Sequence, residues 1–182
     1  MEYTAKTVTL KNGKTCLLRR GEEEDAAMLV DYLKATAGET PYLMREPEEV
    51  QLTAEEERDL IREKNSEERT LNLLAFVDGE HAGNCAFNPV SKHSRTSHRC
   101  TVGIALYRKF WGMGIGTALL GEILAMAKSV GYEQAELDAV SANAPAIALY
   151  RKFGFETTGT MPRVMKYRDG TYADFLFMVK TL

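Results

Sequence analysis

The chain has 182 residues, with 23 Lys and Arg against 26 Asp and Glu, and a formal net charge of −3. Its 45% apolar and 27% charged residues are typical of a globular protein and exclude disordered, collagen-like and membrane-spanning chains. This length predicts one domain over residues 1–182, with a core large enough to be stable without a metal ion or a disulfide. The nearly balanced charge gives no general attraction to nucleic acid or to a membrane surface, so we expect neither partner.

Three cysteines, Cys16, Cys85 and Cys100, have no C-x-x-C spacing, and the three histidines add no metal-ligand spacing to them. We therefore expect neither a disulfide framework nor a metal. The first residues lack the basic and apolar segments of a signal peptide, and no apolar run approaches the roughly 20 residues of a membrane span. These features predict a reduced, cytoplasmic protein, either a monomer or a homodimer.

The first predicted elements are a strand hairpin and two helices. Residues 1–20 form the hairpin, because Asn12-Gly13 supplies the positive φ values of a tight primed turn. The first helix starts at Ala26 behind an acidic run, and the second starts behind a capping box that opens at Thr53. Residues 38–52, between these helices, contain two prolines and are predicted to be irregular.

The remaining predicted elements alternate between strands and helices. Apolar residues recur at helical spacing from Ile115 until Gly131 ends the helix, and Asn143 caps a shorter helix. The predicted strands are residues 70–77, 81–88, 99–107, 134–140, 155–160 and 172–180. This order predicts the α/β class, or an α+β mixed sheet.

Glycines cluster where a predicted strand passes into the following helix. Gly112, Gly114 and Gly116 let successive backbone N–H groups converge at a helix N-terminus, a geometry that holds a pyrophosphate; a packing turn is the other interpretation. A dinucleotide fingerprint requires glycine at position 117, and a P-loop requires lysine after its last glycine, whereas this chain has Thr117 there. Asp138 stands near the acidic position of a dinucleotide site, which alone is weak evidence.

Two motifs in order carry a family resemblance. Val102-Gly103-Ile104-Ala105-Leu106 leads into the glycine cluster, and Asn143-Ala144-Pro145-Ala146 opens a stretch that ends in Phe153-Gly154-Phe155. Together they resemble the GNAT superfamily of N-acetyltransferases, with residues 99–155 as the acetyl-CoA-binding core. The resemblance implies a central, mostly antiparallel mixed sheet flanked by helices, with a splayed strand pair that admits the pantetheine arm of acetyl-CoA. Residues 38–52, on the amine side, have no match.

The resemblance also implies the residues of the site. Ile104 and Leu106 would bond the pantetheine amides, Asn143 would meet the cofactor, and Tyr150 would face its sulfur. The residues around the pyrophosphate would be Trp111, Gly112, Met113, Gly114, Ile115, Gly116 and Thr117.

Trp111 departs from the family pattern, which has Gln or Arg at this position. The backbone N–H groups survive the change, but a polar side-chain contact to the phosphates is lost. Arg108, Lys109, Arg151 or Lys152 can replace a contact of this kind, which is worth about 1–3 kcal/mol when charge-assisted. We include Lys152 among the expected cofactor-binding residues.

Acetyl transfer from a thioester to an amine requires a free amine lone pair, a donor for the carbonyl oxyanion and a proton for the leaving thiolate. We predict that Tyr150 supplies the proton, with core packing as the alternative role, and that a backbone N–H near residues 102–104 faces the oxyanion. The sequence leaves the base open: the candidates are His98, Glu39, Tyr172 and Asp174, acting directly or through a water-mediated relay.

The leading hypothesis is an acetyl-CoA-dependent N-acetyltransferase in which a bound primary amine attacks the thioester directly. The acceptor stays open among a protein N-terminus, a small amine, a polyamine and an amino acid. Two other classes are compatible with the sequence. One is a non-catalytic acyl-CoA-binding sensor or interaction module, supported by Trp111 and Thr101, and the other is a nucleotide-binding protein.

Overall fold

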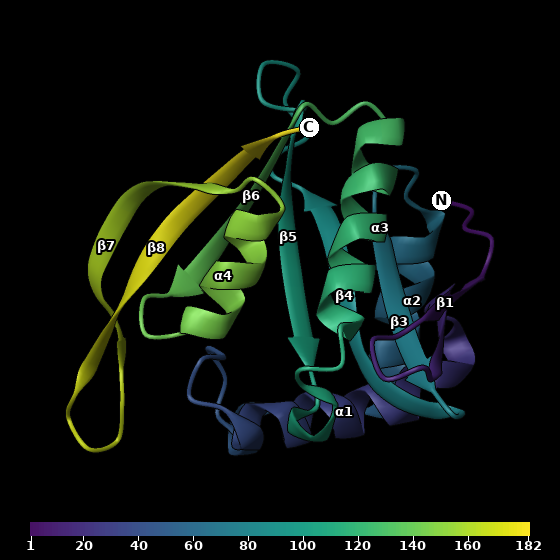
Figure 1. The fold of residues 1–182 in the computed structure, drawn as a ribbon, viewed down its shortest axis with the longest axis horizontal. Coiled ribbons are helices and arrows are strands. Elements are labelled where there is room, and N and C mark those ends of the chain that lie inside the picture. The colour runs from purple at the N-terminus through teal and green to yellow at the C-terminus, as the bar shows by residue number, and fades with distance from the viewer.

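Eight strands form one sheet in the computed structural model, which describes residues 1–182 (Figure 1). The strands are β1 (Lys6–Thr9), β2 (Thr15–Arg20), β3 (Leu71–Val77), β4 (Glu80–Pro89), β5 (Arg99–Leu106), β6 (Gln134–Val140), β7 (Glu156–Lys166) and β8 (Tyr172–Thr181). Their order across the sheet is β1-β2-β3-β4-β5-β6-β8-β7. Only β5 and β6 pair in parallel. The predicted α+β fold with a mixed, mostly antiparallel sheet is therefore confirmed.

Two pairs of helices cover the two faces of this sheet. The helices are α1 (Ala26–Glu39), α2 (Ala54–Ser66), α3 (Ile115–Ser129) and α4 (Ala144–Lys152), with short 3-10 turns η1 (Glu23–Asp25), η2 (Pro47–Glu49) and η3 (Arg108–Phe110). Apolar residues of α3 and α4 form the largest core cluster with one face of the sheet, including Leu73. Leu29 and Tyr32 of α1 and Ile61 of α2 pack on Leu74 from the other face. Adjacent residues of β3 therefore point into two separate cores, as expected for a strand buried on both sides.

Side-chain caps set the starts of two helices. Thr53 Oγ1 accepts a hydrogen bond from Glu56 N at 3.2 Å, and the Glu56 carboxylate accepts one from Thr53 N at 2.8 Å. The predicted capping box before α2 is thus confirmed. At the start of α4, Asn143 Oδ1 accepts from Ala146 N at 3.4 Å, which confirms the predicted cap.

The first hairpin forms, but its predicted tight primed turn is wrong. Of Asn12 and Gly13, only Gly13 has a positive φ, +81°. The loop is longer, since Leu10 N donates to Lys14 O at 2.8 Å and the Leu10 side chain turns into the core, where it is 6% exposed. Burial of Leu10 therefore overrides the local turn preference.

The last hairpin is longer than predicted. β7 continues beyond residue 160 to Lys166, past Pro162, because a bulge between Met161 and Met165 removes the proline from the regular ladder. Arg163 in the bulge takes φ +55° and donates its backbone N–H to Asp174 Oδ1 at 2.8 Å. A side chain from β8 thus satisfies the group that the bulge leaves unpaired.

Three further features follow from the coordinates. No helix is long and apolar enough to span a membrane. No group of three or more His, Cys, Asp or Glu side chains is placed to hold a metal ion. Cys16, Cys85 and Cys100 are buried and unbridged.

Candidate active site

The central feature of the sheet is the divergence of β5 and β6. The two strands pair only over three residues, and the last pair is Thr101 with Glu136. Beyond it, β6 continues to Val140 as a partner of β8, whereas β5 continues to Leu106 as a partner of β4 alone. Figure 1 shows the two arrows starting side by side and separating toward their tips. One edge of β5 is therefore left unpaired inside the sheet.

The open edge of β5 carries the backbone groups of alternate residues. Tyr107 N donates to Ala82 O and Arg99 O accepts from Val90 N, both on the β4 side. Because alternate residues of a strand direct N–H and C=O to opposite edges, Val102, Ile104 and Leu106 present theirs to the gap. Ile104 and Leu106 are the two predicted pantetheine partners. Val102 lies in the range predicted to supply the oxyanion donor.

The glycine loop connects this strand to α3, and its glycines serve different purposes. Gly112 and Gly114 have φ of +76° and +91°, a conformation that residues with a side chain rarely adopt. Gly116 allows close packing, since a Cβ there would lie 3.2 Å from Leu149 of α4 and 3.7 Å from Ile104 of β5. The loop therefore combines a tight turn with close contact between α3, α4 and the open strand.

The N-terminus of α3 lacks a side-chain cap, unlike that of α4. Gly114 is the N-cap residue, so no side chain accepts from the N–H groups of Ile115, Gly116 and Thr117. Unpaired N–H groups at the positive end of a 15-residue helix make a site for an anion. The arrangement is the one expected for holding a pyrophosphate.

The Trp111 side chain points back to the open strand. Its Nε1 donates to Leu106 O at 2.9 Å, and the indole is 43% exposed. The Arg108 guanidinium lies 5.9 Å from the indole centre. Trp111 thus occupies one carbonyl at the mouth of the gap, in addition to its backbone position in the loop.

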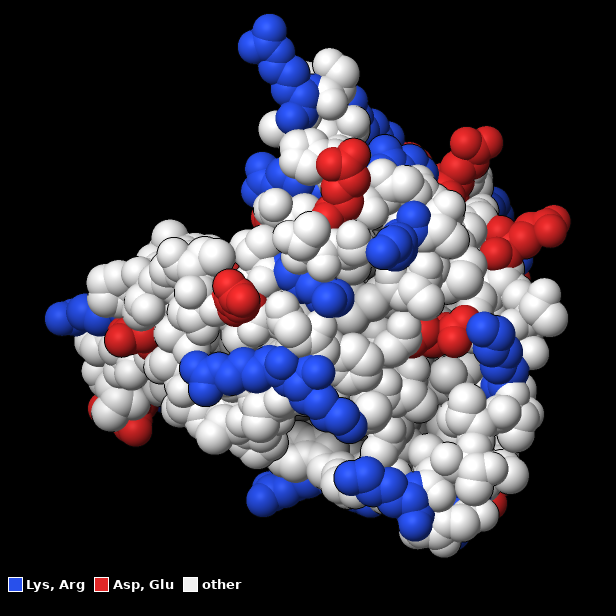
Figure 2. All heavy atoms as spheres, turned by 45° about the horizontal axis from the view of Figure 1, so that its top comes forward, with Lys and Arg blue, Asp and Glu red and all other residues white.

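Several cations in the cofactor-binding half of the chain have no carboxylate partner. Lys109 pairs with Glu80, but Arg108, Arg151 and Lys152 form no ion pair. Figure 2, in which the top of Figure 1 comes forward and the glycine loop at the bottom turns away, shows more blue than red on the visible face, although the chain is net −3. The acidic excess therefore lies elsewhere on the molecule.

Tyr150 approaches the gap from α4. The side chain is 8% exposed and packs edge-on against Phe155, with ring centres 6.0 Å apart. Its hydroxyl forms no hydrogen bond within the protein. Burial raises the pKa of Tyr150, with a smaller contribution from neighbouring Cys85, the residue that pairs with Ile104. The phenol is therefore protonated at neutral pH and free to donate.

The opposite face of the gap carries an acid that sequence reasoning passed over. Ala135, Leu137 and Ala139 of β6 lie in the core with α3 and α4, so Asp138 points to the α1 and α2 face. It is the first residue on that face after the last β5–β6 pair, and Gly103 is its counterpart on β5. A Cβ at Gly103 would meet nothing within 4 Å, so space is open there.

The Asp138 carboxyl makes no hydrogen bond or ion pair. Although the residue is exposed, the atoms around its carboxyl remove part of its hydration, and the neighbouring Glu136 carboxylate adds repulsion. Both effects raise the pKa of Asp138. A weakened acid of this kind is a better proton acceptor than an ordinary aspartate.

The four candidate bases from the sequence are placed less well. Glu39 Oε2 accepts a hydrogen bond from Arg108 N at 2.6 Å, and Asp174 Oδ1 accepts one from Arg163 N in the β7 bulge. Tyr172 is 42% exposed and lies beneath the Arg163 guanidinium, 3.8 Å from the ring centre.

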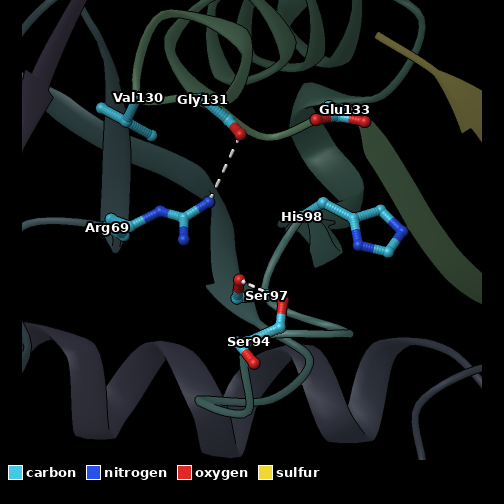
Figure 3. Close-up of a pocket in the computed structure, with 7 residues that line it drawn as sticks. All are labelled: Arg69, Ser94, Ser97, His98, Val130, Gly131 and Glu133. Atoms are coloured by element: carbon cyan, nitrogen blue, oxygen red, sulfur yellow. Dashed lines mark hydrogen bonds between the residues drawn. The ribbon is translucent and has the colours of Figure 1, made fainter.

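His98 lies at the far end of the sheet from the gap. It lines a hollow of about 550 Å³ with Arg69, Ser94, Ser97, Val130, Gly131 and Glu133. Figure 3 shows Arg69 entering this hollow from one side, where it donates to Gly131 O, and His98 and Glu133 on the other side. His98 immediately precedes β5 and is six positions before Ile104, about 20 Å at the usual rise of a strand. His98 is therefore not placed to act at the gap.

Residues 38–52 form one wall of the α1 and α2 face. Tyr42 packs on Val140 and Phe175 beside the gap. Tyr167, beyond β7, donates its hydroxyl to Pro41 O at 3.0 Å, and Arg168 pairs with Glu48 at 3.0 Å and with Glu46 at 3.5 Å. Residues 38–52 are thus held against the tip of the β7–β8 hairpin.

Comparisons with known proteins identify the class. Residues 35–155 match the model of the Acetyltransferase (GNAT) family, so the chain belongs to that family. The matched range includes residues 38–52, so the expectation that this segment has no match in the family was wrong. The L-amino acid N-acetyltransferase AaaT of Escherichia coli (strain K12) is 32% identical over 109 residues, 59% of this chain and 66% of that protein. The match thus spans slightly less than two thirds of this relative.

Solved structures share the architecture over nearly the whole chain. An acetyltransferase of the GNAT family from Streptococcus pneumoniae has a TM-score of 0.87 at 28% identity, covering 92% of this chain and 99% of that one. A putative acetyltransferase, yncA, from Salmonella typhimurium, solved with its cofactor acetyl-CoA, has a TM-score of 0.81 at 18% identity, covering 92% and 94%. The resemblance seen in the two sequence motifs is thus confirmed as family membership and fold.

Proposed function

We propose that this chain transfers the acetyl group of acetyl-CoA to the α-amine of a free amino acid or a similar small molecule. The carrying observation is the gap between β5 and β6, where one edge of β5 is left unpaired. Tyr150 on one face of the sheet and Asp138 on the other support the proposal. Similarity to an L-amino acid N-acetyltransferase supports the acceptor class. Residues 38–52 and the hairpin tip border the amine side, and we expect this wall to suit a small acceptor better than a polypeptide.

The cofactor half of this proposal uses the predicted residues. Ile104 and Leu106 bond the pantetheine arm, the loop from Trp111 to Gly114 and the first turn of α3 through Thr117 hold the pyrophosphate, and Asn143 borders the cofactor. Lys152, which ends α4 and forms no ion pair, stays a predicted contact to the phosphates. Acetyl-CoA is a co-substrate here, so each turnover requires it to bind and CoA to leave.

The reaction assigns one group to each chemical requirement. Asp138 accepts one proton of the bound ammonium, which leaves a neutral amine whose lone pair attacks the thioester carbonyl. The nitrogen of the resulting tetrahedral intermediate loses its second proton to water. Backbone N–H groups of Val102 or Ile104 donate to the carbonyl oxygen as it gains charge. The C–S bond then breaks, and Tyr150 donates a hydrogen bond or its proton to the leaving thiolate.

The test is thiol release from acetyl-CoA by the purified chain, measured against the free L-amino acids, their D-enantiomers, polyamines and short peptides, with a no-amine control. We expect release with one or a few L-amino acids and none with their enantiomers. Release only with peptides or polyamines would reject the acceptor class. CoA binding without release across the panel would instead favour the acyl-CoA sensor.

A further inference from the structure

The N-terminal hairpin reaches the glycine loop through a single side chain. A Cβ on Gly114 would lie 3.5 Å from Lys11 Cγ and 3.9 Å from both Cδ and Cε. The stem of Lys11 therefore runs alongside the N-cap residue of α3, although more than 100 residues separate the two in the chain. Figure 1 shows the purple hairpin ending beside the start of α3.

The position of Lys11 is determined by contacts on either side of it. Leu10, the preceding residue, is buried in the same core cluster as Ile115 and Leu119 of α3. Lys6, on β1, pairs with Glu122 of α3 at 2.5 Å. The hairpin is thus attached to α3 at its first turns and again near its middle, which fixes the loop against the helix N-terminus.

Lys11 is an exposed cation without a carboxylate partner. Lys14, on the same hairpin, differs in this respect, because it pairs with Asp78 at 2.5 Å. At the loop itself, the residue in the position of the usual Gln or Arg is Trp111, whose indole N–H is already bonded to Leu106 O. The loop from Trp111 to Thr117 therefore lacks a charged side chain of its own, and the stem of Lys11 runs alongside its N-cap residue Gly114.

We propose that Lys11 binds the pyrophosphate of acetyl-CoA and supplies the charge that Trp111 does not. This inference rests on the proposed function, because it assumes that CoA occupies the gap. A lysine ammonium is a compact charge suited to phosphate oxygens, and its contact with an anion adds to the N–H groups at the helix start. The N-terminal hairpin is thereby part of the cofactor site, outside residues 99–155.

The experiment compares CoA binding by the wild type, Lys11→Gln and Lys14→Gln. Trp111 is the only tryptophan in the chain and lies at the site, so its fluorescence reports binding directly. We expect Lys11→Gln to weaken CoA binding about tenfold, with a shallower dependence on salt, and Lys14→Gln to bind as the wild type does. Dephospho-CoA, which keeps the pyrophosphate, should show the same tenfold loss.

A phosphate-free donor separates binding from chemistry. With S-acetyl-N-acetylcysteamine, Lys11→Gln should turn over as fast as the wild type. If Lys11→Gln binds CoA as tightly as the wild type, the inference is overturned and the proposed function is not. If Lys11→Gln loses affinity for CoA but not for dephospho-CoA, Lys11 contacts the 3′-phosphate and the pyrophosphate assignment is overturned. A wild-type chain that binds no CoA overturns both the inference and the proposed function.

Discussion

The two faces of the sheet contribute to the gap between β5 and β6 by different means. On the face of α3 and α4, most of the contribution is backbone: the open edge of β5, the loop held by Gly112 and Gly114, and the first turn of α3. On the face of α1 and α2 it is side chains: Asp138, and the wall in which Tyr167 bonds to Pro41. A site made of backbone groups requires a few glycines but tolerates substitution at its other positions. A site made of side chains changes with each substitution. A cofactor common to a family suits the first means, and an acceptor that differs between members suits the second.

The strongest test of this comparison is Asp138→Asn, on the side-chain face. The asparagine amide cannot accept the proton that the Asp138 carboxylate accepts, whereas the cofactor-binding residues are unchanged. Turnover should therefore fall about 10³-fold, with little change in acetyl-CoA affinity. The wild-type rate should rise with pH through the elevated pKa of Asp138, and the variant should lose that step. Asp59→Asn is the control, since Asp59 lies in α2 on the same face and pairs with Arg62. Wild-type turnover by Asp138→Asn would remove it from the mechanism.

A second test concerns His81, a buried side chain on the face of α1 and α2, and its effect on the stability of the protein. His81 is 5% exposed between Tyr32, Phe76 and Tyr107, with both ring nitrogens unpartnered, and burial lowers its pKa to about 4. A free imidazole has a pKa near 6.5, so the unfolded chain binds this proton more readily and folding is most favoured above about pH 6.5. As the pH falls from there to about 4, the free energy of unfolding should drop by about 3 kcal/mol.

Denaturant unfolding of His81→Phe and wild type between pH 7 and pH 4 measures this difference. The variant should be at least as stable at pH 7, because it buries no unsatisfied nitrogen, and should lose less stability on acidification. Exposed His93→Gln is the control and should follow the wild type. Parallel curves for His81→Phe and wild type would show that His81 does not titrate as described.

Tyr150→Phe tests a side chain on the face of α3 and α4, which otherwise contributes mostly backbone groups. The phenyl ring keeps the packing on Phe155 and loses the donor, so turnover should fall about 10²-fold while CoA affinity stays within a factor of about two. The steady-state constants for both substrates, measured across pH, separate these effects. Unchanged turnover would assign Tyr150 to core packing.

Gly114→Ala tests the backbone contribution itself and has the smallest expected effect. At φ +91° an alanine is strained by about 1–2 kcal/mol, so the loop should shift and CoA should bind about tenfold more weakly. Gly79→Ala is the matched control, since Gly79 has φ +81° in the β3–β4 turn and open space around it. Both variants should lose similar stability, but only Gly114→Ala should lose CoA affinity. Equal CoA binding by the two would show that the loop conformation does not matter.

Much of the fold was predictable because its signals are local. The capping box at Thr53, the cap at Asn143 and the helical spacing from Ile115 each involve residues within a few positions of one another. The errors occurred where distant contacts override a local preference. Leu10 leaves the predicted turn for the core, and Asp174 supports a β7 bulge that carries the strand past Pro162.

The site divides in the same way. The strand and loop from Val102 to Thr117 are contiguous, so their sequence identified them. Asp138 was visible only as an isolated acid, since its place beside Gly103 depends on the residue at which β5 and β6 stop pairing. Lys11 carried no signal at all, because nothing in the hairpin sequence indicates that its loop packs against α3.

The sequence by itself determined the family, the order of elements and the contiguous cofactor loop, because short-range hydrogen bonds and glycine conformations are encoded by neighbouring residues. The tertiary structure alone decided which carboxylate faces the gap, which cation lies beside the glycine loop, and how residues 38–52 close on the hairpin tip. Those outcomes depend on strand register and on packing between segments far apart in the chain. Both are set by the burial of the whole core rather than by any local pattern.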